Sequence, residues 1–366
     1  MEVRGMKYRY WLANVTGIGN VTKSRLVGCM GSAKAVYRAK KLELLETGLV
    51  AQGIADYLLE QRKSWDLKRE CEAFVRRGIG LVTIEEEAYP ALLRGIHNAP
   101  YALYYLGTLP KADEKMVAMV GARRCSAYGR TMAEELAAAL AKAGYSVVSG
   151  MAMGIDGAAH CGCLRGGGRS YAFLGCGVDV VYPRQHRPLY QELIAHGAVL
   201  SDYPPGTKPL PVHFPARNRL IAGMAQKTLV IEARAKSGSL ITADLAMEQG
   251  RDVLALPGRV TDPMSEGTNR LIAQGAGIIC GITDLVADMT ELSGLDALTG
   301  KGAPGHLNLE KDELLVYSCF DFYAKGIEEV RRECGMELMP LLSAVMRLCE
   351  LGLLKETFKN QYIRMG

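Results

Sequence analysis

Between residues 79 and 290, short apolar runs alternate with helical segments, and this alternation constrains the fold more than any other feature of the chain. Strands buried on both faces of a sheet give almost unbroken apolar runs, and the helices between them connect parallel neighbours. Intervening segments such as GRTMAEELAAALAKAG have helical periodicity. The pattern predicts an α/β fold with a doubly wound, mostly parallel sheet and right-handed crossovers. Strands are expected at 115–121, 145–150, 170–175, 198–204, 227–233, 252–258 and 276–280.

The pattern changes on both sides of this region, which predicts several domains in a chain of 366 residues. Residues 1–72 have helical character, and a charged helical stretch continues over 58–78. The central α/β domain is expected at 73–290. Residues 291–306 lose the periodicity and hold five glycine or proline residues, as in a linker. Residues 307–366 read as three helices and a short polar hairpin, which predicts a winged helix.

Composition limits the classes of function. The formal net charge of +5 is compatible with a polyanionic partner. Ten cysteines occur without a CxxC pair, so we expect buried, reduced thiols, no metal site and a reducing, cytoplasmic location. The N-terminus has no apolar signal region, and no apolar run reaches the length of a membrane span.

Glycine-rich loops follow most of the predicted strands. In open α/β sheets, ligands bind at the carboxyl ends of the strands, where these loops lie. Glycine lets a ligand approach the backbone closely, and helix N-termini offer free N–H groups to phosphate. The loops predict a phosphate-binding rim. Basic residues expected there are Arg123, Arg124, Arg130, Arg217, Arg219 and Lys236.

The stretch FPARNRLIAG (214–223) indicates the type of ligand. Arginine forks suit phosphate oxygens and can stack on bases, and an aromatic ring beside them is typical of sites for single-stranded nucleic acid. An alternative is that Phe214 is a core residue that precedes a helix, with Pro215 at a tolerated first position. Both interpretations stay open at the level of sequence.

The stretch VSGMAMGIDGAAH (148–160) contains Ser149, Asp156 and His160, which raises the question of a hydrolytic triad. The nucleophile-elbow pattern GxSxG is absent, as are GxGxxG and the Walker A pattern. Ser149 is expected to end a strand. Asp156 falls at a helix start, where a carboxylate caps free N–H groups, and His160 lies four residues on, where it can pair with Asp156. We therefore expect a structural turn and no enzyme activity.

Several long blocks resemble the DNA-processing protein A (DprA/Smf) family over residues 115–277. The blocks are VGARRCSAYGR, VVSGMAMGIDGAAH, HFPARNRLIAG, EARAKSGSLITADLAMEQGRDVLALPG and SEGTNRLIAQGA. The resemblance implies an extended Rossmann-like domain between an N-terminal SAM-like, helix-hairpin-helix domain and a C-terminal winged helix. It also implies a non-catalytic protein without cofactor that protects incoming single-stranded DNA and loads the RecA recombinase in natural transformation, as a homodimer through the Rossmann domain.

The resemblance also implies a set of DNA-binding residues. The chain departs from the family at Ala122, where a serine is usual, and at Met153 and Pro211, where members often carry basic residues, so contacts at these positions are expected to be missing. The implied residues are Gly121, Arg123, Arg124, Ser126, Gly150, Gly154, Phe214, Arg217, Asn218, Arg219, Lys236, Ser237, Gly238 and Ser239.

Two accessory elements have alternative interpretations. GIGNVTKSRL resembles a helix-hairpin-helix turn in which Lys23 and Arg25 hold a phosphate, although packing or a protein contact is also possible. The last predicted helix, LMPLLSAVMRLCELG, has Arg347 as its one basic residue, whereas a groove-reading helix carries several polar side chains. This favours a protein-interaction or regulatory role for the winged helix.

Two other functions stay open. One is a Rossmann-type hydrolase of nucleotides or nucleoside monophosphates, similar to the lysine-decarboxylase-like phosphoribohydrolases. Those enzymes use a PGGxGT loop and a glutamate, whereas this chain has RAKSGSLITA where such a loop would fall, with no equivalent glutamate beside it. The other is a module that senses a small nucleotide.

Overall fold

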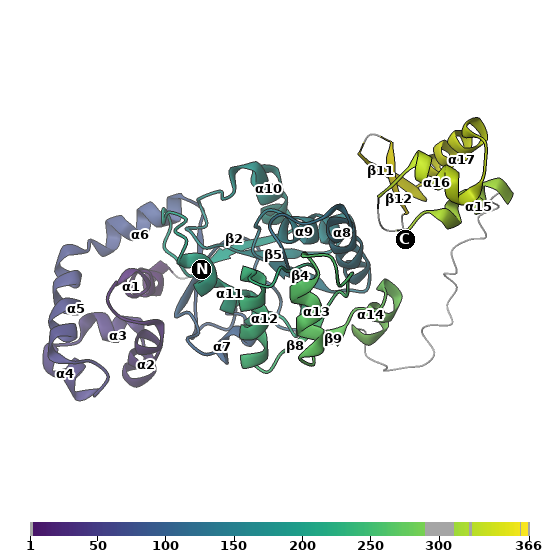
Figure 1. Ribbon diagram of the computed structural model, residues 1–366. Coiled ribbons are helices and arrows are strands. Elements are labelled where there is room, and N and C mark those ends of the chain that lie inside the picture. Colours follow the sequence, from purple (N-terminus) through teal and green to yellow (C-terminus); the bar gives the residue numbers. More distant parts are fainter. Residues whose placement is uncertain (1–2, 290–310, 322–323, 359, 365–366) are drawn as a thin grey trace. The chain divides into compact units, whose positions relative to one another are not determined.

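The computed structural model describes residues 3–289, 311–321, 324–358 and 360–364 (Figure 1). It divides into a larger unit, which comprises residues 3–125 and 129–289, and a smaller C-terminal unit. The predicted linker at 291–306 lies outside the described residues. The domain boundaries expected from the sequence stay predictions.

A nine-stranded sheet forms the centre of the larger unit, in the order β1-β2-β6-β5-β4-β3-β7-β8-β9. All seven strands expected from the apolar runs are present, and they pair in parallel. The prediction of a doubly wound, mostly parallel sheet is confirmed. The parallel strands are β3 (Met116–Val120), β4 (Ser146–Ser149), β5 (Ser170–Phe173), β6 (Gly197–Ser201), β7 (Lys227–Val230), β8 (Asp252–Ala255) and β9 (Gly277–Ile278).

Two further strands extend the sheet beyond β6 and were not expected from the sequence. β1 (Gly80–Thr83) pairs with β2 (Ala102–Gly107), and β2 pairs with β6, both in antiparallel fashion. β2 becomes exposed towards its end, so it does not form the unbroken buried run that is typical of the central strands.

Helices cover both faces of the sheet. Alternate side chains of one strand point to opposite faces, so Tyr171 and Phe173 pack into one apolar cluster and Ala172 into the other. α11 and α12 cover the first face, and α10 packs on the second. The helices are α7 (Ala91–Arg94), α8 (Ala127–Lys142), α9 (Ile155–Arg165), α10 (Arg187–Ala195), α11 (His213–Gly223), α12 (Gly238–Glu248), α13 (Glu266–Ala273) and α14 (Ile282–Met289), with a 3-10 turn η1 (Arg184–His186) before α10.

The N-terminal region is helical, as expected. The stretch 58–78 is not one helix, however, because the chain breaks between α5, which ends at Ser64, and α6, which begins at Leu67. Asp66 caps α6 by accepting the backbone N–H groups of Lys68 and Arg69 at 3.0 Å each. Tyr10 stacks on Phe74 with ring centroids 4.3 Å apart, which packs the first and last helices together. The helices are α1 (Val3–Asn14), α2 (Asn20–Met30), α3 (Ala33–Arg38), α4 (Lys41–Glu46), α5 (Gln52–Ser64) and α6 (Leu67–Arg76).

The structure corrects the role considered for Lys23. This side chain is 5% exposed, and its Nζ donates to the carbonyl oxygen of Ala13 at 2.9 Å. Burial lowers the pKa of Lys23 to about 8. Lys23 therefore ties α1 to α2 and does not face a phosphate, whereas Arg25 on the same helix is exposed.

The C-terminal unit contains α15 (Lys311–Cys319), α16 (Ile327–Cys334) and α17 (Leu338–Glu350). The predicted hairpin is present as β11 (Leu354–Phe358) and β12 (Gln361–Arg364), and β10 (Lys325–Gly326) adds a third antiparallel strand. Its core includes Val330, Leu341, Val345 and Leu348. Three helices with a small sheet agree with the predicted composition, and the assignment as a winged helix stays a prediction.

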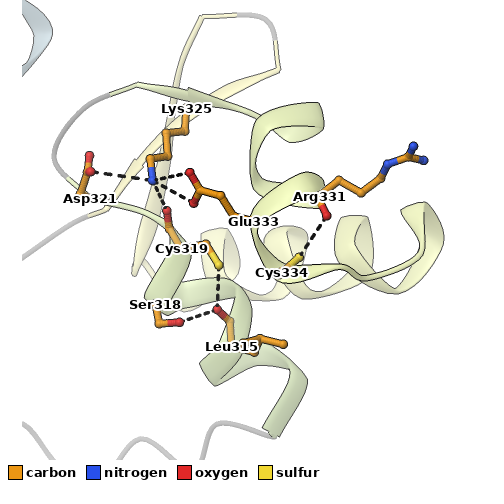
Figure 2. A network of polar contacts seen from close by, with 8 residues as sticks. All are labelled: Leu315, Ser318, Cys319, Asp321, Lys325, Arg331, Glu333 and Cys334. Carbon is orange, nitrogen blue, oxygen red and sulfur yellow. Dashed lines mark hydrogen bonds and ion pairs between the residues drawn. The ribbon is translucent and has the colours of Figure 1, made fainter.

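Lys325 organises a polar network in this unit (Figure 2). Its Nζ donates to the carbonyl oxygen of Cys319 at 2.7 Å and lies 3.0 Å from a Glu333 carboxylate oxygen and 3.9 Å from Asp321. The Glu333 carboxylate raises the pKa of Lys325. The network joins the end of α15 to α16, so we assign it to stability of the small unit.

All ten cysteines are free, but the expectation that they are buried is only partly correct. Cys71, Cys163 and Cys176 are buried, whereas Cys29, Cys161 and Cys280 are exposed. Within the described ranges, no helix has the length and apolarity needed to cross a membrane, and no cluster of three or more His, Cys, Asp or Glu side chains has the arrangement of a metal site.

Candidate nucleic-acid interface

The strand order creates a crevice between β3 and β7. The chain adds β4, β5 and β6 on one side of β3, then returns to add β7, β8 and β9 on the other side. The loops after β3 and β7 therefore diverge, which is the usual place for a ligand in such sheets. A pocket of about 490 Å³ lies there. Its lining includes Gly121, Ala122, Arg123, Arg124, Ala152, Asp156, Pro211, Phe214, Pro215, Arg217, Asn218, Arg234, Lys236, Ser237, Gly238, Ser239 and Ile241.

Four exposed cations border this pocket. Arg123 and Arg124 follow β3, and Arg234 and Lys236 follow β7. In the part of the chain that the structure describes, none of the four forms an ion pair. The carboxylate in the lining, Asp156, is 7% exposed and lies beneath them. The rim is therefore positively charged on both sides, which suits a ligand with several phosphates.

Arg217 lies at the floor of the pocket and is 4% exposed. Its Nη1 donates to the backbone carbonyl of Gly150 at 3.0 Å and to that of Phe173, and its Nε donates to Asn218 at 3.3 Å. Burial lowers the pKa of Arg217, and the Asp156 carboxylate opposes this effect. Its Nη1 thus joins the ends of β4 and β5 to α11.

Asp156 is buried close to Arg217. Burial raises the pKa of Asp156, and the nearby Arg217 guanidinium and backbone N–H groups of the preceding turn oppose the rise. Its Oδ2 accepts the N–H of Ala152 at 3.4 Å. A methyl group on Gly150 would lie 2.7 Å from both Arg217 Nη2 and Asp156 Oδ2. Glycine at this position therefore leaves room for both charged groups.

Gly154 packs the turn before α9 closely against the loop that follows β3. Its φ is +80°, which favours glycine, and a side chain there would meet the carbonyl oxygen of Ala122 at 2.2 Å. Ile155 donates its N–H to the same carbonyl at 3.2 Å. The turn before α9 thus fixes the position of the loop that carries Arg123.

Phe214 is half-buried at the first turn of α11 and faces the pocket. The Arg123 guanidinium lies 5.4 Å from its ring centroid, and its ring edge packs over Gly175. The ring of Tyr182 lies 5.4 Å away at 37°. Sequence reasoning missed Tyr182, although an aromatic residue near the carboxyl end of β5 is a signal that could have found it.

The turn after β7 supplies polar groups. Ser237 caps α12, and its hydroxyl is 2.7 Å from that of Ser239. Asn218 approaches the same turn, since its Nδ2 donates to the carbonyl oxygen of Gly238 at 3.4 Å. These contacts place the N-terminus of an eleven-residue helix beside Lys236 at the pocket wall.

The structure brings ten of the fourteen predicted residues to the pocket lining and leaves four outside it. Gly150 and Gly154 support the lining from behind, and Ser126 precedes α8. Arg219 points elsewhere, because its Nη2 donates to Asp202 at 2.6 Å in a largely buried ion pair. Arg130, also expected on the rim, lines a different groove. The role of each residue stays a prediction.

The expected pairing of His160 with Asp156 is wrong. His160 is fully buried, and its Nδ1 lies 2.7 Å from the hydroxyl of Ser170, while Asp156 accepts the N–H of Ala152 and is influenced electrostatically by Arg217. Burial lowers the pKa of His160 to about 3. Ser149 donates its hydroxyl to the carbonyl oxygen of Met119 at 2.6 Å. The three residues therefore do not have the nucleophile–base geometry of a triad.

Comparison with known proteins gives consistent matches. The family "DNA recombination-mediator protein A" matches residues 80–290. Protein Smf of Synechocystis sp. is 37% identical over 78% of this chain and 74% of its own length. DNA processing protein DprA of Streptococcus pneumoniae is 43% identical over 56% of this chain and 73% of its own.

Two solved structures are similar in fold. The X-ray structure of DNA processing protein A from Streptococcus pneumoniae has a TM-score of 0.68 and 33% identity, and the match covers 77% of this chain and 97% of that one. A structure of DNA processing protein A from Helicobacter pylori, described for its single-stranded DNA binding mode, has a TM-score of 0.52 and 31% identity. That match covers 56% of this chain and 94% of the other.

Proposed function

Because the chain belongs to the DNA recombination-mediator protein A family, we propose that it is a non-catalytic protein that binds single-stranded DNA in the pocket between β3 and β7. The observation that carries this proposal is the arrangement of four exposed cations, none ion-paired with a described residue, around a pocket that Phe214 lines. The Helicobacter pylori relative, described as binding single-stranded DNA, supports the same ligand.

The geometry suggests how the strand is held. Phosphates lie on Arg123 and Arg124 on one wall and on Arg234 and Lys236 on the other, where charge attraction is independent of sequence. A base stacks at Phe214, whose ring is flanked by the Arg123 guanidinium. A base in a duplex is already stacked and paired, so a stacking site at Phe214 favours the binding of single strands.

The finer biological role is also a proposal. Protection of incoming single-stranded DNA, loading of RecA onto it, natural transformation in the cytoplasm and a homodimer through the Rossmann-like domain all follow from the family resemblance. The names of the Streptococcus pneumoniae and Bacillus subtilis relatives, DNA processing protein DprA, support a role in DNA processing. A nucleation assay of RecA filaments on coated single strands, with and without the protein, tests the loading step.

Binding is tested by comparing single- and double-stranded oligonucleotides in mobility-shift assays at several salt concentrations. We expect preference for the single strand, and a strong loss of affinity in the Arg123→Ala/Lys236→Ala double variant. Lys142→Ala is the matched control, because Lys142 is exposed at the end of α8 and does not line the pocket. A double variant with full affinity and unchanged melting would show that the site is wrong.

A nucleotide hydrolase or nucleotide sensor is the alternative proposal, and it has less support. A side chain at Gly129 would meet the carboxylate of Glu232 at 2.2 Å, so an internal anion lies against the first turns of α8. Nucleotide-binding sheets use that helix start for a phosphate, and the carboxylate of Glu232 would repel a phosphate there. Release of free base from nucleoside monophosphates, or calorimetric binding of nucleotides tighter than of oligonucleotides, would favour the alternative.

A further inference from the structure

A second groove lies beside the pocket, across the turn that precedes α9. Its volume is about 460 Å³, and residues of α8, α9, η1 and α10 form its walls. Met153 and Gly154 lie at this groove, whereas Ala152 and Asp156 of the same turn line the first pocket. One short turn therefore separates the two hollows, so a ligand that fills the first has a direct route into the second.

Tyr182 lies on the segment that connects the two sites. It follows β5 and immediately precedes the Pro183–His186 segment whose Gln185 and His186 line the groove. Its ring is 42% exposed and packs against Phe214 of the first pocket. A large aromatic ring that is both exposed and in contact with the floor of a nucleic-acid site provides a second surface for base stacking.

The segment that carries Tyr182 is held in place. His186 Nδ1 lies 3.0 Å from the carbonyl oxygen of Met151, and a methyl group on Gly157 would meet the His186 ring at 2.7 Å. η1 is therefore packed directly on the turn and on α9. Tyr182 is positioned by this contact and by Phe214.

The charges along the groove permit a polyanion. Arg130 is exposed in the groove wall and forms no ion pair with a described residue, whereas Glu134 beside it is paired with Arg165 at 3.3 Å. Glu192 is the other carboxylate of the wall, and the exposed Arg184 and Arg187 lie next to the lining residues Gln185 and His186. With Arg184 and Arg187, which flank the lining, three arginines lie along the groove beside the two carboxylates of Glu134 and Glu192.

From this geometry we propose that a single strand held in the pocket continues over Tyr182 into the groove along α9, with Tyr182 as a second stacking residue and Arg130 as a phosphate ligand. This inference rests on the proposed function. It adds a second nucleotide subsite at Tyr182, which lies in none of the family blocks, and it gives the bound strand a path across the carboxyl ends of β4 and β5.

The test is the affinity of oligothymidylates of increasing length, measured by fluorescence anisotropy. Tyr182→Ala leaves the affinity for the shortest bound oligonucleotide unchanged and weakens binding of longer ones by about 5- to 150-fold, the value of one stacked base. Tyr182→Phe is the matched control and retains the affinity. Arg130→Gln lowers the salt dependence, as the slope of log K against log salt, by about 0.7 for long oligonucleotides only.

Two results would overturn the proposal. Tyr182→Ala with wild-type affinity at every length would remove Tyr182 from the path, and an equal loss at every length, including the shortest, would mean that Tyr182 only supports Phe214. Failure of the proposed function looks different, because the wild-type protein would then bind no oligonucleotide of any length. Melting curves of each variant show that the loss is not caused by unfolding.

Discussion

The salt dependence of DNA binding tests the pocket most directly, because it counts phosphate contacts. Four exposed cations line the pocket: Arg123, Arg124, Arg234 and Lys236. Each contact with a single-stranded phosphate contributes about −0.7 to the slope of log K against log salt, so four contacts give about −2.8. Raising the salt from 50 to 200 mM should then weaken binding of a short oligonucleotide roughly fiftyfold.

Replacing Arg123 and Lys236 by glutamine removes one cation from each wall. The slope should fall to about −1.4, and the same change of salt should weaken binding only about sevenfold. Anisotropy titrations at five or more salt concentrations provide the slope, and Lys142→Gln serves as the control with a wild-type slope. If the double variant bound more weakly but kept the wild-type slope, these residues would not contact phosphates and the reasoning would be refuted.

Three further predictions concern the support of the pocket. Gly150→Ala should lower the free energy of unfolding by about 1–3 kcal/mol and reduce DNA affinity, because the new methyl group crowds the buried side chains of Arg217 and Asp156. Urea titration measures the loss of stability, and anisotropy measures the loss of affinity. A variant as stable as wild type would show that the methyl group does not crowd these side chains. Arg217→Gln should cost about 3–5 kcal/mol because the buried Asp156 carboxyl loses the compensating positive charge of the guanidinium, whereas adding Asp156→Asn should restore part of the stability without lowering the salt slope. A drop of about 0.7 in the slope of the double variant would instead identify Arg217 as a phosphate ligand. Burial lowers the pKa of His160 from 6.5 to about 3 in the folded protein. As the pH falls from about 6.5 towards 3, this histidine becomes protonated in the unfolded chain but stays neutral in the folded one. The stability that neutral His160 contributes is therefore lost over this pH range. His160→Asn should therefore show a smaller decline in melting temperature between pH 7.5 and 4.5 than wild type, and an equal decline would count against this assignment.

The sequence by itself determined the sheet and the location of the site. Apolar runs of strand length with helices between them specify a parallel sheet, because burial on both faces demands apolar residues at every position of the strand. The glycine-rich loops and the FPARNR block pointed to the edge where the pocket lies, since carboxyl ends of parallel strands share one edge. The two antiparallel strands β1 and β2 were missed, and β2 lacked this signal because it becomes exposed towards its end.

Only the tertiary structure decided which basic residues are available to a ligand. Arg217 and Arg219 are two positions apart in one motif, yet the first is buried against strand ends and the second is paired with Asp202. Lys23 is buried under a turn that resembles a phosphate-binding one. These outcomes depend on contacts between residues far apart in the chain, such as Gly150 with Arg217 and Tyr182 with Phe214. Local pattern carries no information on such pairs, because the order of the strands in the sheet decides which loops meet.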